Sequence, residues 1–371
     1  MEDCSLEFLS HMEKKAKSGG SLNMQLCYQE FTLDVIARIA MGQHDSQMFN
    51  NPILADIKAF FESNRWQIWM LAGVYPPAVD FLKFLFNKLH LFGAGPFVRV
   101  QKMVNEAVTE RIKQRENDKE KGIEQGEPAD FIDLFLDAKA DVDFFDETNS
   151  DFQKNVSYNN RQLTTQEIIS QSFVFMIAGF DTTALSLSYV TYLLATNPDK
   201  MKLVQEEIDR ECRDPSITFE QLAKLKYTDN VMKESARMYP LAGFATSRRC
   251  MRTTRIGEYT VEAGTDVMVD IWELHYDKKI WGQDADEFTP ERWESGEEKF
   301  QKSGYLPFGL GPRQCMGMRL AQLEEKLLLA HLLRKYSFEP TRDTQIPMKL
   351  VGRSTMRPES LNLKLVSRYS N

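Results

Sequence analysis

The spacing of apolar side chains predicts a mainly helical chain. Apolar residues recur every three or four positions over residues 21–41, and a second helical segment begins at Pro96. The longest stripe starts at Thr164 or Thr165, either of which can cap a helix, and continues to Leu194. Further helices are predicted over residues 198–212, 218–226, 227–239 and 316–336.

Other segments depart from helical spacing. Residues 255–271 alternate at the period of a strand around Ala263-Gly264, which predicts a hairpin, and residues 361–365 alternate as a late strand. Residues 138–162 are rich in Asp and Asn and predict a loop. Residues 53–92 are unusually aromatic, which indicates either protein core or a surface that dips into a membrane or lines a substrate entrance. The whole pattern predicts mostly helix with a few short strands.

Composition narrows the class of protein. The chain has 371 residues, 42% hydrophobic and 27% charged, as in soluble globular proteins, and we expect one domain over residues 1–371. The net charge of -8 and the absence of a dense basic block argue against nucleic-acid binding. The chain contains no run of eighteen apolar residues, so the sequence predicts no bilayer-spanning segment. Five cysteines without CxxC spacing give no support to a structural zinc site or a disulfide framework.

The most informative stretch reads PFGLGPRQCMG. It places Phe308, Gly311, Arg313, Cys315 and Gly317 at FxxGxRxCxG spacing, just before a predicted helix. The glycines let the backbone curl against a flat cofactor, and the amide groups at a helix start favour a thiolate. A thiolate is a strong axial donor to haem iron. A free cysteine in a glycine-rich turn is the alternative, which the complete five-position pattern disfavours.

This pattern resembles that of the cytochrome P-450 superfamily, and most closely the clan of vertebrate 3A-type and nematode enzymes. The resemblance implies a mainly α fold with small β-sheets and haem b (iron protoporphyrin IX) as cofactor. Cys315 would bind the iron, Phe308 would pack beside the sulfur, and Arg313 would pair with a haem propionate. Residues 1–371 correspond to the C-terminal three quarters of the usual fold. No Trp is followed by Arg four positions later, so we expect a chain truncated at its N-terminus, without the family's WxxxR propionate clamp.

A second motif lies midway along the longest predicted helix. The run AGFDTT begins at Ala178 and resembles the family's oxygen-activating helix. Ala178 and Gly179 would lie against the cofactor, and the missing side chain of Gly179 would let oxygen and substrate approach. Asp181 and Thr182 form an acid–alcohol pair that suits the delivery of protons to dioxygen. A helix with a polar kink is the alternative.

Charged residues form the third element of the resemblance. Glu234 and Arg237 stand at ExxR spacing on one helix face, and Arg292 lies in a second motif. The resemblance implies one buried cluster of these three behind the cysteine loop, with a surface ion pair as the alternative. Trp293 replaces the usual Phe, which we take as a conservative change.

The remaining site predictions rest on the resemblance alone. Arg248 is predicted to reach a haem propionate, with Arg249 as the alternative by one residue. His275 is predicted either to form hydrogen bonds near the propionates or to be a plain surface histidine. The predicted substrate pocket draws on Val174, Ile177, Ala178, Thr182, Ala242, Gly243, Ser354 and Thr355.

The implied function is a monooxygenase. It would insert one oxygen atom from O2 into apolar small molecules (xenobiotic, steroid or fatty-acid-like), with electrons from NADPH through a flavoprotein reductase. It would work at the cytosolic face of the endoplasmic reticulum membrane, with a possible peripheral contact. Basic residues would dock the reductase or be ordinary solvated charges, namely Lys299, Lys302, Arg319 and Lys326. The alternatives are a truncated, haem-poor non-catalytic protein and, less in keeping with the cysteine loop, a helical scaffold unrelated to haem.

Overall fold

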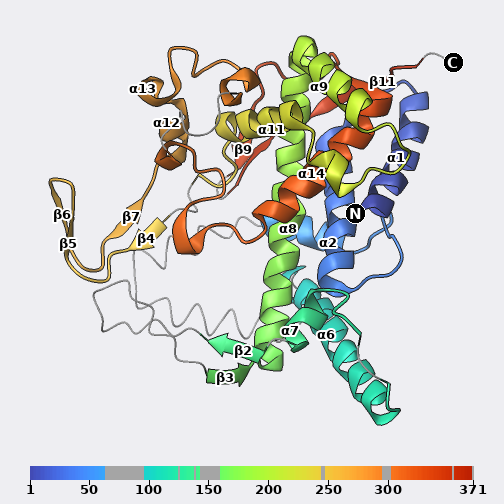
Figure 1. The fold of residues 1–371 in the computed structure, drawn as a ribbon, viewed down its shortest axis with the longest axis vertical. Coiled ribbons are helices and arrows are strands. Elements are labelled where there is room, and N and C mark those ends of the chain that lie inside the picture. Colours follow the sequence, from blue (N-terminus) through green and yellow to red (C-terminus); the bar gives the residue numbers. More distant parts are fainter. Residues whose placement is uncertain are drawn as a thin grey trace. The chain divides into compact units, whose positions relative to one another are not determined.

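The computed structural model shows mostly helices with small antiparallel sheets, as the sequence predicts. The chain divides into two compact units, Met1–Thr32 with Asp181–Asn371, and Leu33–Phe180. The bounds of the units fall within helices α2 (Met24–Met41) and α8 (Thr165–Thr196), both labelled in Figure 1. The single domain expected from the sequence stays a prediction. The structure describes residues 1–62, 96–123, 126–137, 139–142, 159–243, 247–294, 302–352 and 355–369.

The unit Leu33–Phe180 is built on one apolar core. Parts of α2 and α8 enclose it together with α3 (Leu54–Glu62), α6 (Pro96–Glu120) and α7 (Phe131–Asp137). Two short strands, β2 (Lys139–Val142) and β3 (Asn159–Gln162), pair antiparallel within the segment predicted to be a loop. Of the aromatic segment 53–92, the structure describes the part within α3; the prediction of a membrane contact falls on residues outside the described ranges. The buried side chains of this core include Leu33, Ile36, Ile57, Val100, Val104, Val108, Ile132, Met176 and Phe180.

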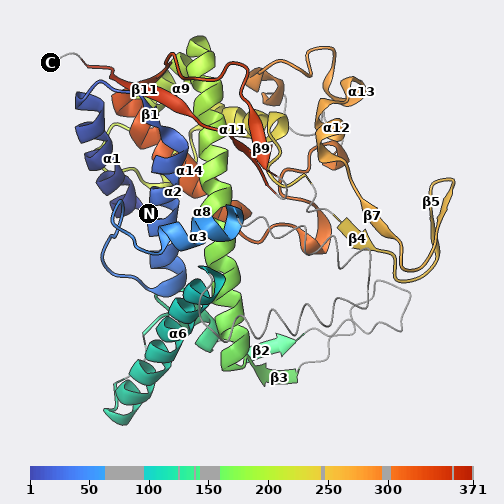
Figure 2. The same cartoon turned by 180° about the vertical axis from the view of Figure 1, so that it is seen from behind.

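In the other unit, helix α14 is the central element. It packs against α1 and α9, as Figures 1 and 2 show. Its residues Leu327 to Leu333 are all buried. Short helical turns follow α11 and carry much of the predicted site. The helices and turns of this unit are α1 (Glu2–Lys17), α9 (Pro198–Glu211), α10 (Phe219–Leu222), α11 (Lys226–Met238), α12 (Ile271–Tyr276), α13 (Lys278–Trp281), η1 (Pro290–Trp293), η3 (Lys302–Gly304), η4 (Gly311–Arg313) and α14 (Met318–Lys335).

The late strand predicted from alternation is confirmed. Strand β11 (Asn362–Ser367) pairs antiparallel with β1 (Leu22–Asn23) on one side and with β8 (Tyr336–Pro340) on the other. Leu363 and Leu365 are buried, whereas Lys364 between them is exposed. The short strands β9 (Leu350–Gly352) and β10 (Met356–Pro358) form a separate antiparallel pair.

The predicted hairpin exists, but its turn lies elsewhere. Strand β5 (Thr254–Ile256) pairs with β6 (Tyr259–Val261), and the chain turns at Gly257, which has φ +58°. Strands β4 (Ser247–Arg249) and β7 (Asp266–Met268) form a second pair at the base of this hairpin (Figure 1). The hairpin predicted around Ala263-Gly264 is therefore wrong: the chain turns there, with the Thr265 N–H donating to the Glu262 carbonyl at 3.2 Å, but the flanking strands β6 and β7 pair with other strands. Both glycines adopt positive φ, so the presence of a turn-forming residue did not identify which turn joins paired strands.

Helix α8 begins where its capping residues predict. The Thr164 hydroxyl accepts a hydrogen bond from the Glu167 N–H at 3.2 Å, and the Glu167 carboxylate accepts from the Thr164 N–H at 2.8 Å. This reciprocal arrangement is a capping box and identifies Thr164 as the cap. By length and composition α8 is apolar enough to cross a membrane, although 56% of its most apolar window is buried inside the protein. Buried core helices have the same composition.

Candidate active site

The Cys315 loop runs from η4 to the start of α14. Gly309 and Gly311 have φ of +72° and +78°, a conformation that side chains with a Cβ rarely adopt. The Cys315 N–H donates to the Phe308 carbonyl at 2.9 Å, which closes the loop. Gly317 then caps α14. The thiol of Cys315 is exposed, just before the first free amide groups of that helix.

This geometry fits a flat cofactor bound through sulfur. Nothing lies within 4 Å of the Cβ position at Gly311, so a ring system can approach the backbone there. At Gly317 the Cβ position is 4.0 Å from the Cys315 Sγ, so a larger side chain would crowd the sulfur. Arg313 is exposed, as a partner of a propionate must be, and Phe308 is half-buried. The residues present therefore suit a haem.

His275 fastens this loop to the scaffold beneath it. It is fully buried, and its Nε2 accepts a hydrogen bond from the Leu306 N–H at 2.9 Å. Its Nδ1 lies 3.0 Å from the Arg237 carbonyl, so the neutral ring carries its proton on Nδ1 and donates there. Burial lowers the pKa of His275 to about 4. The interpretation as a surface histidine is wrong, and because both nitrogens bind backbone, His275 has none left for a propionate.

The ExxR helix and the second arginine motif meet around one buried carboxylate. Arg237 binds Glu234 through Nε at 3.0 Å and Nη2 at 2.8 Å, and the Arg292 Nε donates to the same carboxylate at 2.8 Å. The Thr289 N–H adds a donor at 3.2 Å. The structure thus brings Glu234, Arg237 and Arg292 together, with both side chains of the ExxR pair fully buried. The alternative of a surface ion pair is wrong.

Trp293 is more than a replacement for Phe. Its indole N–H donates to the Glu234 Oε2 at 2.9 Å, a hydrogen bond that Phe cannot make. The ring is 4% exposed and packs with Trp281 and Tyr305. The sequence-based view of a conservative change missed this donor, since spacing does not reveal which way an indole points.

The two adjacent arginines on β4 have different environments. Arg249 pairs with Asp266 on β7 at 2.8 Å. Arg248 is also exposed and donates to the Ser247 carbonyl. Neighbouring side chains of a strand point to opposite faces. Arg249 is therefore committed to an ion pair, which favours Arg248 as the residue for a propionate.

Gly179 lies at a close contact between two helices of the Leu33–Phe180 unit. A Cβ at this position would be 2.7 Å from the Cδ1 of Ile36 and 2.9 Å from its Cγ1. The missing side chain therefore faces α2, where it allows the two backbones to approach. Helix packing is therefore one reason for a glycine here, and its role in the approach of oxygen stays a prediction.

One face of α8 carries the residues predicted to meet oxygen and substrate. Val174 and Ala178 are exposed and Thr182 is half-buried, at a spacing of four residues that places them on one face. Ile177 lies half-buried beside them. Met176 and Phe180, by contrast, belong to the buried core.

Asp181 is turned away from that face. It is 2% exposed, and its Oδ1 accepts a hydrogen bond from the Gln29 Nε2 at 2.8 Å. Gln29 lies on α2 and is 3% exposed. Sequence reasoning missed this partner, since Gln29 is one of several polar residues on the buried side of α2 and nothing in the spacing singles it out.

The predicted substrate positions near the C-terminus lie at a junction of three segments. The Met356 N–H donates to the Leu241 carbonyl at 3.2 Å, and the Tyr189 hydroxyl of α8 donates to the Met356 carbonyl at 2.6 Å. Ala242 and Thr355 adjoin this junction and are half-buried.

Two other predicted positions differ from these. Gly243 is buried, with its Cβ position 3.0 Å from the Trp272 ring, so packing accounts for its small size. Ser354 lies outside the described residues.

Of the basic residues predicted to dock a reductase, Lys326 instead pairs with Asp229 and donates to the Leu222 carbonyl. Arg319 is exposed.

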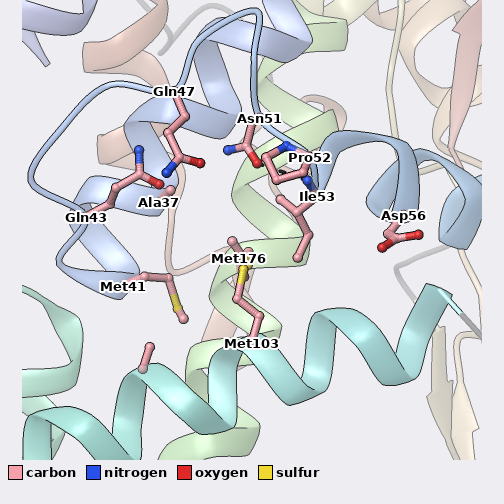
Figure 3. A pocket seen from close by; sticks show the side chains of 11 residues that line it. Ala37, Met41, Gln43, Gln47, Asn51, Pro52, Ile53, Asp56, Met103 and Met176 are labelled. Atoms are coloured by element: carbon pink, nitrogen blue, oxygen red, sulfur yellow. Dashed lines mark hydrogen bonds between the residues drawn. The ribbon is translucent and has the colours of Figure 1, made fainter. Parts of the chain in front are cut away.

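A cavity of about 410 Å³ lies in the Leu33–Phe180 unit. Met41, Met103 and Met176 point into it from α2, α6 and α8, and the amides of the loop after α2 stand around it (Figure 3). Among the described residues, none of the predicted substrate positions lines it. It is therefore distinct from the predicted substrate pocket.

Comparison with known proteins agrees with this geometry. The cytochrome P-450 family model matches residues 1–365. The chain is 60% identical over 368 residues to the Caenorhabditis elegans cytochrome P-450 CYP13A8, with 99% of this chain and 72% of that protein aligned. It is 57% identical over 371 residues to CYP13A10 of the same organism, with 99% and 72% aligned. The chain belongs to the cytochrome P-450 family and is a haem-thiolate monooxygenase whose cofactor is haem b.

Proposed function

We propose that this chain inserts one oxygen atom from O2 into apolar small molecules of xenobiotic, steroid or fatty-acid type. Electrons come from NADPH through a flavoprotein reductase, at the cytosolic face of the endoplasmic reticulum membrane. The observation that carries the proposal is the exposed Cys315 thiol in a glycine-rich loop at the start of α14. Haem, when bound there, supplies the activation of dioxygen.

Binding of the cofactor is the task of the Cys315 loop. Cys315 provides the sulfur ligand, and the nearby start of α14 stabilises its thiolate. Arg313 and Arg248 pair with the propionates; both are exposed, and the neighbouring Arg249 is engaged with Asp266. A planar guanidinium suits a carboxylate because it donates two parallel hydrogen bonds.

Positioning of that loop is the task of the cluster around Glu234. From Arg237 a hydrogen bond leads to His275, and from His275 another leads to Leu306, nine residues before Cys315 in the chain. Tyr305 adds a hydrogen bond from its hydroxyl to the Lys233 carbonyl at 3.1 Å. These hydrogen bonds fix the position of the segment that leads to Cys315, and they do not contact the cofactor.

Substrate and protons are handled by α8. The exposed side chains of Val174 and Ala178 offer an apolar face to a substrate, with Ile177 beside them and Ala242 and Thr355 as further candidates. Asp181 supplies protons, and the Thr182 hydroxyl on the substrate face passes them on. Burial of Asp181 limits its exchange of protons with bulk water without preventing it.

A carbon monoxide difference spectrum tests the proposal. The chain is expressed with haem supply, reduced, and exposed to carbon monoxide. A thiolate ligand gives a strongly red-shifted Soret band, and we expect this band in the wild type and in the control Cys250→Ala, which removes a half-exposed thiol elsewhere. Cys315→Ala should abolish it. Haem uptake that is equally good in Cys315→Ala would show that the sulfur of Cys315 is not the ligand, and no uptake by the wild type would favour the haem-poor non-catalytic alternative.

A further inference from the structure

Gln29 is a buried amide placed directly against the predicted proton donor. Its Nε2 lies 2.8 Å from the Asp181 Oδ1, and the two side chains are 3% and 2% exposed. They come from α2 and α8, 152 positions apart, within the same compact unit. Because both side chains are buried, a polar atom of either one that lacks a hydrogen bond would lower the stability of the fold.

An amide side chain matters here because it can both donate a hydrogen bond to a carboxyl group and accept one from it. Amide nitrogen donates and amide oxygen accepts, so one side chain can pair with either an ionised or a protonated acid. The Gln29 Oε1 is buried and has no hydrogen-bond partner among the described residues. It is therefore available to accept from the Asp181 O–H after rotation of the amide. Lys or Arg in this place would serve the ionised form alone.

We propose that Gln29 is a positioning residue for proton delivery, which holds the Asp181 carboxyl group in both of its protonation states. When Asp181 is ionised, the Gln29 N–H donates to it. When Asp181 has taken up a proton from solvent, its O–H donates to the Gln29 Oε1. The acid keeps one location while a single proton leaves and is replaced. This inference rests on the proposed role of Asp181 as the proton donor.

A purely structural role makes a different prediction. If Gln29 only filled space and satisfied a buried acid, its loss would lower stability and leave the share of electrons that reach product unchanged. If Gln29 positions the acid for transfer, its loss lowers that share even in protein that folds and binds haem normally. The two roles separate in a measurement of coupling, the amount of product formed per NADPH oxidised.

The first experiment observes the hydrogen bond itself. Infrared spectra are recorded for the haem-loaded wild type, Gln29→Leu and the control Gln25→Leu. Gln25 is an amide one turn earlier on α2, 6% exposed, for which the structure gives no hydrogen bond to Asp181. The Asp181 carboxyl bands are identified by their loss in Asp181→Asn. We expect them to shift in Gln29→Leu and to stay in place in Gln25→Leu; unshifted bands in Gln29→Leu would overturn the proposal.

The second experiment is a double-mutant cycle on coupling, with a lipophilic alkoxycoumarin as the probe substrate and purified reductase. Loss of a hydrogen bond to a charged group corresponds to about tenfold to hundredfold, so Gln29→Leu should lower coupled turnover by about tenfold or more. In the Asp181→Asn background the same change should cost less than about twofold, because Gln29 acts through Asp181.

The outcomes separate this inference from the proposed function. If Asp181→Asn and Thr182→Ala uncouple the enzyme and Gln29→Leu does not, Gln29 has no positioning role and the proton pathway stands. If Asp181→Asn itself leaves coupling unchanged, the proposed role of Asp181 is wrong. Equal losses from Gln29→Leu in both backgrounds would show that Gln29 acts by another route, and would overturn the inference.

Discussion

Replacing Trp293 by Phe removes one hydrogen-bond donor from the buried Glu234 carboxylate. The indole N–H lies 2.9 Å from the Glu234 Oε2, and the ring is 4% exposed. After the substitution Glu234 keeps Arg237, Arg292 and the Thr289 N–H, so its charge stays paired. The expected result is a folded protein of lower stability, since one bond is lost and the ion pairs remain.

The size of the effect follows from the acceptor. A hydrogen bond to a charged group contributes about 1.5–3 kcal/mol, against about 0.5–1.5 kcal/mol for a neutral pair. Trp281 provides a matched control, because its indole donates at 3.0 Å to the neutral carbonyl of Leu274 and its ring is 3% exposed in the same cluster. Both Trp→Phe changes leave a similar cavity. Trp293→Phe should therefore cost about 1 kcal/mol more than Trp281→Phe.

Equilibrium urea unfolding of the haem-loaded protein, followed by far-ultraviolet circular dichroism, measures this difference. Dichroism avoids the loss of fluorescence that accompanies removal of a tryptophan. A lower midpoint with an unchanged denaturant slope identifies a change in stability. Equal losses in the two variants would refute the reasoning, because they would show that the bond to Glu234 adds nothing beyond a neutral one.

Two further predictions concern helix packing and acid stability. Gly179→Ala places a Cβ 2.7 Å from Ile36 and should cost about 1–3 kcal/mol in thermal unfolding, and Ile36→Ala should cost less in that background than in the wild type; an undiminished melting temperature in Gly179→Ala would contradict the packing argument. The pKa of His275 falls from 6.5 to about 4 on folding, so the unfolded chain binds the proton more readily and stability is lost as the pH falls between these values. Over that range the wild type should lose roughly 3 kcal/mol more than His275→Gln, measured by urea unfolding at several pH values, and parallel pH profiles would show that His275 titrates normally.

The sequence predicts local features of this protein better than distant contacts. The Cys315 loop and the cap of α8 depend on residues a few positions apart, so spacing indicated the loop and limited the cap to Thr164 or Thr165. The extent of α8 follows from its apolar period, which its burial then bears out. The local backbone conformation fixes how residues a few positions apart lie relative to one another.

Contacts between distant segments were beyond that reasoning. Gln29 meets Asp181 across 152 positions, and nothing in either helix states which face of one meets which face of the other. His275 was assigned to the surface or the cofactor because an isolated histidine gives no sign of burial. The packing role of Gly179 was missed for the same reason, since its neighbour Ile36 lies on another helix.

Arg237 illustrates how completely a charge can be withdrawn from the outside of a protein. Its guanidinium donates to Glu234 twice and to the carbonyls of His275, Ala285 and Glu287, so all of its N–H groups are occupied internally. An approaching electron-transfer partner can form no hydrogen bond with it. Arg237 therefore adds one positive charge to the formal charge of the chain, but it is not available for an ion pair with a partner protein.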